Sequence, residues 1–496
     1  MNAHEALSVL DGVEEQAAHL SQVSALLHWD RSTQMPKDGL DARAQSMTIV
    51  ASQMHELVTA PKLVRAIAVL KKEKLSRKDA RRVERYDRVV SRSRKLPAEH
   101  VRELAELSAR AEHAWEEAKS SSDFSLFRPF LERLVSLKRE EARLIDARKK
   151  PYDVLLDDFE EGMTQDRIAV TFARIRERLV PLLDAIRSSE RFSEKTALPS
   201  RFSVSGQRSF SERIARDILG DGRDWVLEES VHPFTTTISP RDVRITTAYR
   251  DDNLSAVSAT VHEAGHALYE LGFKRVFSSS ILGEAPSYGI HESQSRFWEN
   301  HVGLSYPFWQ FAYRQLRSDI PELSGLRLER FYREVNRVEP SLIRIYADEL
   351  TYPLHIIIRF EIERALFSGE LEAKDVPKAW NRAYEEYLGI TPPDDARGCL
   401  QDVHWSMGAF GYFPSYLIGT VYSAQISERM ERDIGYRAKV RAGDFEPVRT
   451  WLFEKIHRHG QMMLADDTIL KATGSRLDPD VFVGYLEEKY GAIYQL

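Results

Sequence analysis

Apolar residues recur at helical spacing through the first part of the chain. Leu104, Leu107 and Ala111 fall on one stripe of a helix, and charged residues occupy the positions between them. A breaker signal, Leu96-Pro97, separates this segment from the preceding one. The pattern predicts a series of packed helical hairpins with few strands.

The middle of the chain predicts two short β-strands and then a long helix. Residues 234–238 and 242–247 are rich in β-branched side chains, and residues 239–241 between them have the composition of a turn. The amphipathic run 254–271 predicts the helix. The expected fold class is therefore mainly α, with a small β-sheet beside this helix.

The composition is that of an ordinary globular protein, with 43% hydrophobic and 29% charged residues. The formal net charge is only -6, so no global field attracts the chain to nucleic acid or to an anionic membrane. Residues 71–95 carry twelve basic and four acidic side chains. We interpret this run as a solvated helix face with partial i,i+4 pairing, because no aromatic platform accompanies the charge. No nucleic-acid partner is expected.

Cysteine content and the apolar segments indicate the cellular setting. The single cysteine, Cys399, excludes an internal disulfide framework and a multi-cysteine metal cluster. No Lys or Arg precedes Arg31, so a secretory signal is not expected. Residues 403–427 lack charge and are long enough to span a bilayer, but they mix glycine, proline, histidine and aromatic residues. We expect a cytoplasmic protein without membrane contact, in which this segment lines a site.

The clearest chemical motif is His262-Glu263-Ala264-Gly265-His266, inside the helix predicted at 254–271. Residues four apart project from one face of a helix, so both histidines can bind one divalent ion. Glu263 lies beside them and can act as general base toward a metal-bound water. Gly265 costs the helix about 1 kcal/mol relative to Ala. Close approach of a neighbouring ligand helix would account for this glycine, as would simple tolerance of it.

A catalytic zinc site usually has three protein ligands and one open position. The extended motif with a further histidine is excluded, because Tyr269 and Gly272 occupy the positions it requires. Glu292 is our first choice for the third ligand, and His291 and Glu284 remain competitors from spacing alone. A site with two histidines and one glutamate lowers the pKa of bound water to about 7. The reaction predicted is metal-assisted hydrolysis of an amide bond.

At this point the chain resembles the carboxypeptidase Taq family of metallocarboxypeptidases, over nearly its full length. Six short motifs carry the resemblance in family order, and none departs from the pattern at a defining letter. They are His232-Pro233-Phe234, Asp242-x-Arg244-x-Thr246, His262-Glu263-x-x-His266, His291-Glu292-Ser293-Gln294, Ile343-Arg344-x-x-Ala347-Asp348 and Gly398-x-x-Gln401-Asp402-x-His404-Trp405.

The resemblance implies a saddle-like, mainly helical subunit with a deep substrate groove, assembled as a homodimer. Residues 1–200 would form a helical wall of the groove and residues 201–496 the catalytic part, within one continuous peptidase unit. It also implies that Glu292 completes the metal site and that Glu263 is the general base. The metal is expected to be zinc, one ion per subunit, although cobalt or manganese serves some members.

A carboxypeptidase must bind the free α-carboxylate of its peptide, and a guanidinium can do so with two parallel hydrogen bonds. Arg344 is our first candidate and Arg244 the second. Each could instead form a structural ion pair, Arg344 with Asp348 at i+4 and Arg244 with Asp242. The predicted strands could bind an extended peptide through its backbone, which would give broad specificity.

The last motif offers a donor for a developing oxyanion. His404 is the candidate, with Tyr412 or Tyr416 as possible helpers. His232 and Gln401 are expected to organise the site. Two other functions compete with a carboxypeptidase: an oligopeptidase with an open groove, and a non-catalytic helical scaffold that binds peptides. The intact base of the HExxH motif argues against the scaffold.

Overall fold

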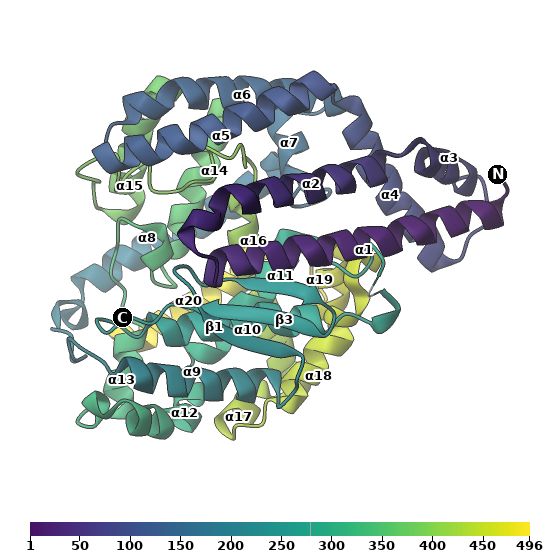
Figure 1. Cartoon of the computed structure of the whole chain (residues 1–496). Helices are drawn as coiled ribbons and strands as arrows, with labels where there is room; N and C mark the ends of the chain where they lie inside the picture. Colours follow the sequence, from purple (N-terminus) through teal and green to yellow (C-terminus); the bar gives the residue numbers. More distant parts are fainter. Residues whose placement is uncertain (278) are drawn as a thin grey trace.

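Helices make up most of the molecule, as predicted (Figure 1). The computed structural model describes residues 1–277 and 279–496, and across these residues the chain forms twenty α-helices and one three-stranded sheet. The mainly α fold class with a small sheet is therefore confirmed.

The N-terminal helices form a long hairpin and a small separate core. Their bounds are α1 (Ala3–Thr33), α2 (Leu40–Thr59), α3 (Pro61–Leu70) and α4 (Arg77–Lys95). In Figure 1 the hairpin of α1 and α2, in purple, crosses the middle of the molecule above the sheet. Leu10, Leu63, Ile67 and Tyr86 belong to a hydrophobic cluster of α1, α3 and α4 that is distinct from the main core.

The remaining helices before the sheet are longer and more apolar on one side. They are α5 (Ala98–Ser121), α6 (Phe124–Asp146), α7 (Pro151–Leu156), α8 (Gln165–Ser188) and α9 (Val204–Leu219). The stripe predicted on α5 packs against α6, and Ala111 is fully buried there. Asp123 and Thr164 begin α6 and α8 by accepting backbone N–H bonds at their first turns.

The sheet has the order β1-β3-β2, with β1 parallel and β2 antiparallel to β3. Strand β3 (Asp242–Thr247) has the predicted bounds, and β2 (Thr235–Ser239) is shifted by one residue from the prediction. Strand β1 (Trp225–Glu229) was not predicted, because it is mostly exposed and lacks a clear apolar alternation. The central strand β3 packs on the helix that carries the HExxH motif.

The helices that carry the predicted site residues lie in the C-terminal half of the chain. In chain order they are α10 (Ser255–Leu271), α11 (Tyr288–Arg296), the π-helix η4 (Phe297–Gly303), α12 (Tyr306–Asp319), α13 (Leu328–Val335), α14 (Tyr352–Ser368), α15 (Val376–Leu388), α16 (Phe413–Ile434), α17 (Tyr436–Arg441), α18 (Glu446–Lys455), α19 (Ala465–Thr473) and α20 (Pro479–Tyr494). Helix α10 has nearly the bounds predicted for it.

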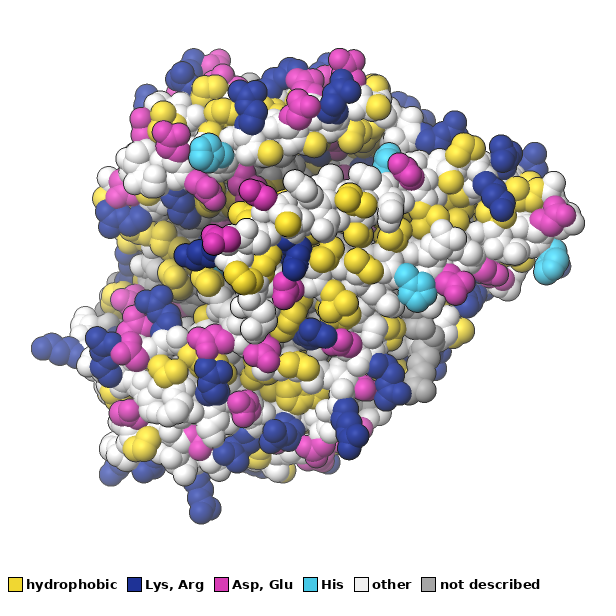
Figure 2. Space-filling model, in the orientation of Figure 1, with side chains coloured by type: hydrophobic (Ala, Val, Ile, Leu, Met, Phe, Trp, Pro, Cys, Tyr) yellow, Lys and Arg dark blue, Asp and Glu magenta, His cyan; other side chains and the backbone are white. Residues whose placement is uncertain are grey.

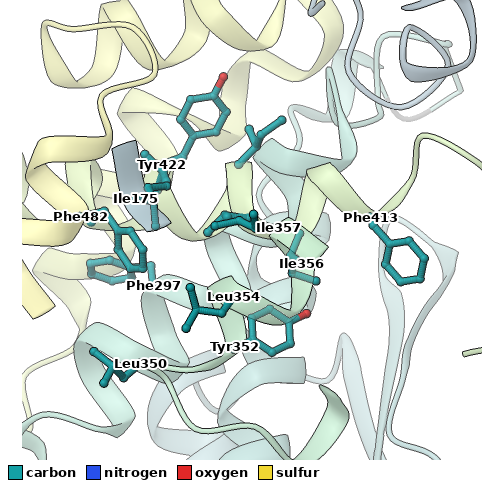
Figure 3. Packing of buried hydrophobic residues seen from close by; sticks show 14 of the residues in the cluster. Ile175, Phe297, Leu350, Tyr352, Leu354, Ile356, Ile357, Phe413, Tyr422 and Phe482 are labelled. Atoms are coloured by element: carbon teal, nitrogen blue, oxygen red, sulfur yellow. The ribbon is translucent and has the colours of Figure 1, made fainter. Parts of the chain in front are cut away.

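One large hydrophobic core joins these helices to α5–α9. Figure 3 shows a part of it in which α8, η4, α14, α16 and α20 contribute Ile175, Phe297, Ile357, Tyr422 and Phe482. The core draws on residues from both sides of position 200, and the predicted division into a wall and a catalytic part stays a prediction.

The basic run at 71–95 differs from its interpretation as a solvated face. Arg82 on α4 is buried and bonds to Glu14 of α1 at 2.7 Å. Arg88 forms an ion pair with Asp157 at 2.8 Å, after α7. These partners lie far away in the sequence, so local i,i+4 pairing could not reveal them. Much of the charge on α4 therefore joins the N-terminal helices to the body of the molecule.

The surface of the molecule carries both charged and hydrophobic side chains. Figure 2 shows charged side chains scattered over the visible face and hydrophobic ones over the α1–α2 hairpin, where Leu26, Leu40 and Ile49 are exposed. Among the helices described, none has a stretch of the length and apolarity that would span a bilayer. The uncharged segment 403–427 forms a loop and most of α16, and Cys399 just before it is buried.

Candidate active site

Helix α10 presents the HExxH motif toward a large cleft. Its opposite face, with Val257, Val261 and Leu268, is buried in the core as predicted. His262 and His266 are one turn apart, and their rings meet edge to face with centroids 4.9 Å apart. Both line the cleft, which has a volume of about 1260 Å³. The amphipathic pattern of the helix thus directs both imidazoles toward the cleft.

Glu292 lies on α11 and faces both histidines. Its Oε2 is 3.8 Å from Nε2 of His262 and 3.4 Å from Nε2 of His266. One donor atom from each of the three residues can be chosen so that all lie within 4.8 Å of one another. Two imidazole nitrogens and a carboxylate oxygen are a donor set that suits zinc and related divalent ions. The three residues singled out from the sequence therefore converge.

His291 and Glu284, the competing ligands, are directed elsewhere. Both ring nitrogens of His291 already have hydrogen-bond partners: Nδ1 lies 2.7 Å from Nδ1 of His266, and Nε2 lies 2.8 Å from Glu270. The amide of Gln461 donates to Glu284 at 2.9 Å, and this glutamate is not part of the three-residue cluster.

Two glycines let the neighbouring helices approach α11 closely. A Cβ at Gly265 of α10 would lie 2.7 Å from the carbonyl oxygen of Gln294 and from Cα of Ser295. On another side, a Cβ at Gly419 of α16 would lie 2.7 Å from Cβ of Glu292. Of the two explanations considered for Gly265, the structure shows the close helix approach, and α11 lies between two backbones that only glycine permits to come so near.

Acidic side chains surround the metal-binding cluster. Burial disfavours a charged His262, but Glu299 and Glu292 outweigh this effect and raise its pKa to about 9. Burial lowers the pKa of His266, and the charge of His291 adds to this shift. Burial also opposes ionisation of Glu292, but Arg296 and the histidines hold its pKa well below the usual range. The local field therefore favours a cation between these groups.

Glu263 lines the cleft beside the two histidines and is only 7% exposed. The hydroxyl of Thr235 on β2 donates to its Oε2 at 2.6 Å. This bond fixes the carboxylate of Glu263 on the cleft side of α10. The small sheet therefore holds the side chain predicted to act as general base.

Arg344 lies at the cleft wall in a short 3-10 turn, Arg344–Tyr346, and is 7% exposed. Its Nε and Nη2 donate to Oδ1 of Asp402 at 3.0 and 2.8 Å, and Nη1 donates to the hydroxyl of Tyr352 at 3.3 Å. The alternative pairing with Asp348 is absent, since Asp348 accepts backbone N–H bonds from Leu350 and Thr351 instead. A 3-10 turn does not keep the i,i+4 spacing on which that pairing depended.

Arg244 and Asp242 are not among the residues that line the cleft. They form a bidentate ion pair with two bonds of 2.8 Å, and the guanidinium of Arg244 lies over the ring of Trp29 on α1. Trp29 also packs edge to face against Phe234. The pair thus serves the contact between the sheet and α1, which is the structural alternative considered for it.

The remaining predicted residues divide between the cleft and its support. His232, Tyr412 and Tyr416 line the cleft. His404 does not; it lies behind the tyrosines, with Nε2 3.4 Å from the hydroxyl of Tyr416. Gln401 is also outside the lining, and its Oε1 accepts from the backbone N–H of Arg344 at 2.9 Å. Gln401 therefore contacts the backbone of Arg344, and its role in organising the site stays a prediction.

Sequence reasoning missed several carboxylates and arginines. Glu299 lies 2.7 Å from Nδ1 of His262, and Glu270 is bonded to His291. Helical spacing offered a signal, because Glu270 is four residues after His266 and shares its face. Arg88 and Arg92 of α4 also line the cleft. No local pattern marks them, because their place depends on how α4 packs.

A mainly helical fold in which the two histidines of an HExxH motif and a glutamate converge at a large cleft is typical of a metallopeptidase. The chain belongs to the carboxypeptidase Taq (M32) family of metallopeptidases, whose model matches residues 10–490. Carboxypeptidase 1 of Bacillus subtilis is 39% identical over 487 residues, 97% of each chain. Thermostable carboxypeptidase 1 of Thermus thermophilus is 37% identical over 496 residues, again 97% of each.

Solved structures agree with this assignment. The crystal structure of the M32 carboxypeptidase from Deinococcus radiodurans R1 superposes with a TM-score of 0.96 at 37% identity, and the match covers 99% of this chain and 100% of the other. Trypanosoma cruzi metallocarboxypeptidase 1 gives a TM-score of 0.94 at 34% identity, covering 98% and 99%. The protein is thus an enzyme of the metallocarboxypeptidase class.

Proposed function

We propose that the enzyme removes single residues from the C-termini of peptides with broad specificity, and that Glu263 is its general base. The observation that carries this proposal is the convergence of His262, His266 and Glu292 within 4.8 Å, beside Glu263 in one cleft. The family supports a metal ion, and we infer zinc, one per subunit, with cobalt or manganese as substitutes. We further infer a homodimer from the family resemblance, and a cytoplasmic location from the single cysteine and the N-terminal sequence.

A divalent ion in this site would acidify a water molecule and polarise the scissile carbonyl. Glu263 accepts a proton from the attacking water and passes it to the departing amine. The hydroxyl of Thr235 keeps the carboxylate of Glu263 in place during this transfer. Tyr416 donates a hydrogen bond to the developing oxyanion, and His404 orients its hydroxyl from behind.

Arg344 anchors the C-terminal carboxylate. Its Nη1 has only a long bond to Tyr352, so this edge of the guanidinium can turn to a carboxylate. Asp402 holds the other edge, which fixes the plane of the guanidinium. The rings of Phe413 and Tyr416 pack at 5.7 and 5.2 Å from its central carbon. An open groove without such an anchor would instead favour an oligopeptidase.

Strand β2 is suited to hold the peptide backbone. Strand β3 is paired on both sides and has no free edge, so of the two predicted strands only β2 can accept an added strand. Thr235 of β2 lines the cleft next to Glu263. Backbone pairing there positions the scissile bond without reading side chains, which supports broad specificity.

A second cavity can receive the side chain of the C-terminal residue. It has a volume of about 280 Å³ and shares Arg296 and Tyr352 with the cleft wall. The guanidinium of Arg296 lies 4.2 Å from the centroid of the Tyr352 ring, and both side chains line the two cavities where they adjoin. Apolar residues such as Val261, Phe308 and Phe331 line the far side. A roomy apolar pocket discriminates weakly among side chains.

The test combines elemental analysis with product analysis. We expect about one zinc per chain and stepwise release of single C-terminal residues from a blocked peptide, with little release from its C-terminal amide. Glu263→Gln should keep the metal and lose hydrolysis, whereas Glu292→Ala should lose the metal. Internal cleavage, or equal activity on the amide, would instead support the oligopeptidase. Stoichiometric metal without any hydrolysis would support the peptide-binding scaffold.

A further inference from the structure

The two histidines of the cluster are held from behind in different ways. Each directs Nε2 toward Glu292, so each Nδ1 faces away from the cluster. Nδ1 of His262 lies 2.7 Å from Oε2 of Glu299. Nδ1 of His266 lies 2.7 Å from a second imidazole, that of His291. His262 thus contacts a carboxylate directly, whereas His266 contacts another histidine.

The contact behind His266 continues through three more groups. A histidine that binds a metal through Nε2 carries its hydrogen on Nδ1, so His266 donates to Nδ1 of His291. His291 then carries its own hydrogen on Nε2 and donates to Glu270 at 2.8 Å. The other oxygen of Glu270 accepts from the hydroxyl of Thr237 on β2 at 2.9 Å. Each hydrogen bond in this row, which runs from His266 through His291 and Glu270 to Thr237, therefore has one donor and one acceptor.

The contact between His262 and Glu299 belongs to a closed ring of charged groups. Arg296 donates to Glu299 at 3.0 Å and to Glu292 at 2.7 Å. Glu299 therefore links His262 on α10 to Glu292 on α11 through one arginine. It lies in the π-helix η4, directly after α11. Glu270 has no such link to Glu292, and its row reaches His266 alone.

We propose that Glu299 and the pair His291–Glu270 are positioning residues that orient the two metal-binding histidines by two independent routes, one direct and one in series from strand β2. A partner at Nδ1 fixes the tautomer and ring orientation of a ligand histidine and increases its basicity. The direct route supports two ligands and the serial route supports one. This inference rests on the metal site of the proposed function.

The test measures zinc affinity, by competition with a chromophoric chelator, in variants that leave all three ligands intact. Glu299→Gln should weaken zinc binding about 10- to 100-fold, and Glu270→Gln about tenfold or less. Glu284→Gln is the matched control, because Glu284 is another carboxyl that lines the cleft, where Gln461 donates to it, and it contacts neither histidine. Its zinc affinity should stay within about twofold of the wild type.

Double variants separate the two routes. In a His291→Phe background Glu270→Gln should have no further effect on zinc affinity, since the row is already broken, whereas Glu299→Gln should multiply the loss. His291→Gln, whose amide can both accept and donate, should regain part of the affinity. Thr237→Val should weaken binding slightly and Thr237→Ser should not. The absorption spectrum of the cobalt form reports ligand geometry independently of activity, and circular dichroism confirms folding.

Two results would overturn the inference. Full additivity of His291→Phe and Glu270→Gln would show that they do not act in series. A wild-type zinc affinity in both Glu299→Gln and Glu270→Gln would show that neither route orients a ligand. A wild-type protein that binds no zinc would contradict the proposed function itself, so the two failures are distinguishable.

Discussion

Replacing Gly265 by alanine tests whether the metal site depends on close contact between two helices. The new Cβ would lie 2.7 Å from Gln294 O and Ser295 Cα, whereas ordinary contacts begin at 3.4 Å. The α10–α11 spacing must therefore grow locally by about 0.7 Å, the difference between these two distances. Metal–ligand distances tolerate only about 0.2 Å. His266 and Glu292, on opposite sides of this contact, would no longer fit one ion.

Stability and metal affinity should respond differently to Gly265→Ala. Overpacking costs about 1–3 kcal/mol, and the better helix propensity of alanine offsets about 1 kcal/mol. We expect a net loss of about 0–2 kcal/mol in unfolding free energy of the metal-free protein, together with a loss of zinc affinity of about tenfold or more. Denaturant unfolding and chelator competition measure the two quantities.

Another helical glycine provides the control. Nothing lies within 4 Å of a Cβ at Gly484 on α20, so Gly484→Ala should stabilise the protein by about 0.4–1 kcal/mol and leave zinc affinity unchanged. Gly419→Ala should behave like Gly265→Ala, because its Cβ would press on Glu292. A Gly265→Ala variant as stable as Gly484→Ala and with wild-type zinc affinity would refute the close-contact reasoning.

Three further changes address the anchor, the oxyanion and a buried carboxyl. Arg344→Lys should raise KM about 10- to 100-fold for peptides with a free carboxylate and far less for their amides; equal effects would remove the anchor role. Tyr416→Phe should lower kcat about 10²-fold with little change in KM, and an unchanged kcat would exclude the donor role. Burial raises the pKa of Glu160 from 4.5 to about 7. The folded state then binds this proton more tightly than the unfolded state, so stability falls as pH rises from about 4.5 to about 7, by up to about 3 kcal/mol. Glu160→Gln should remove this decline in unfolding free energy between pH 5 and pH 8; an unchanged slope would contradict it.

Local patterns predicted the parts of the site that local structure decides. The helix at 254–271 was predicted from its amphipathic periodicity, and the strand at 242–247 from its β-branched side chains and the turn before it. The HExxH motif placed His262 and His266 on one face, because residues four apart project from the same face of a helix. Glu292 needed the family resemblance, since spacing alone left His291 and Glu284 as competitors.

Contacts between distant segments could not be predicted in this way. Arg344 pairs with Asp402, which is 58 residues away and has no regular spacing from it. The ion pairs of α4 with Asp157 depend on how two helices dock. Glu299 contacts His262 from a π-helix. The wider turn of a π-helix cannot be predicted from the spacing of apolar residues. Such pairings follow from tertiary packing, and packing determines which charges are structural and which face the cleft.

The buried position of Cys399 bears on how inhibition of this enzyme can be interpreted. It is the only thiol in the chain, and burial together with the nearby charge of Asp395 raises its pKa, so it stays protonated and unreactive near neutral pH. Alkylating agents and mild oxidants therefore find no nucleophilic sulfur. Loss of activity on treatment with an alkylating agent would therefore indicate modification of a side chain other than Cys399.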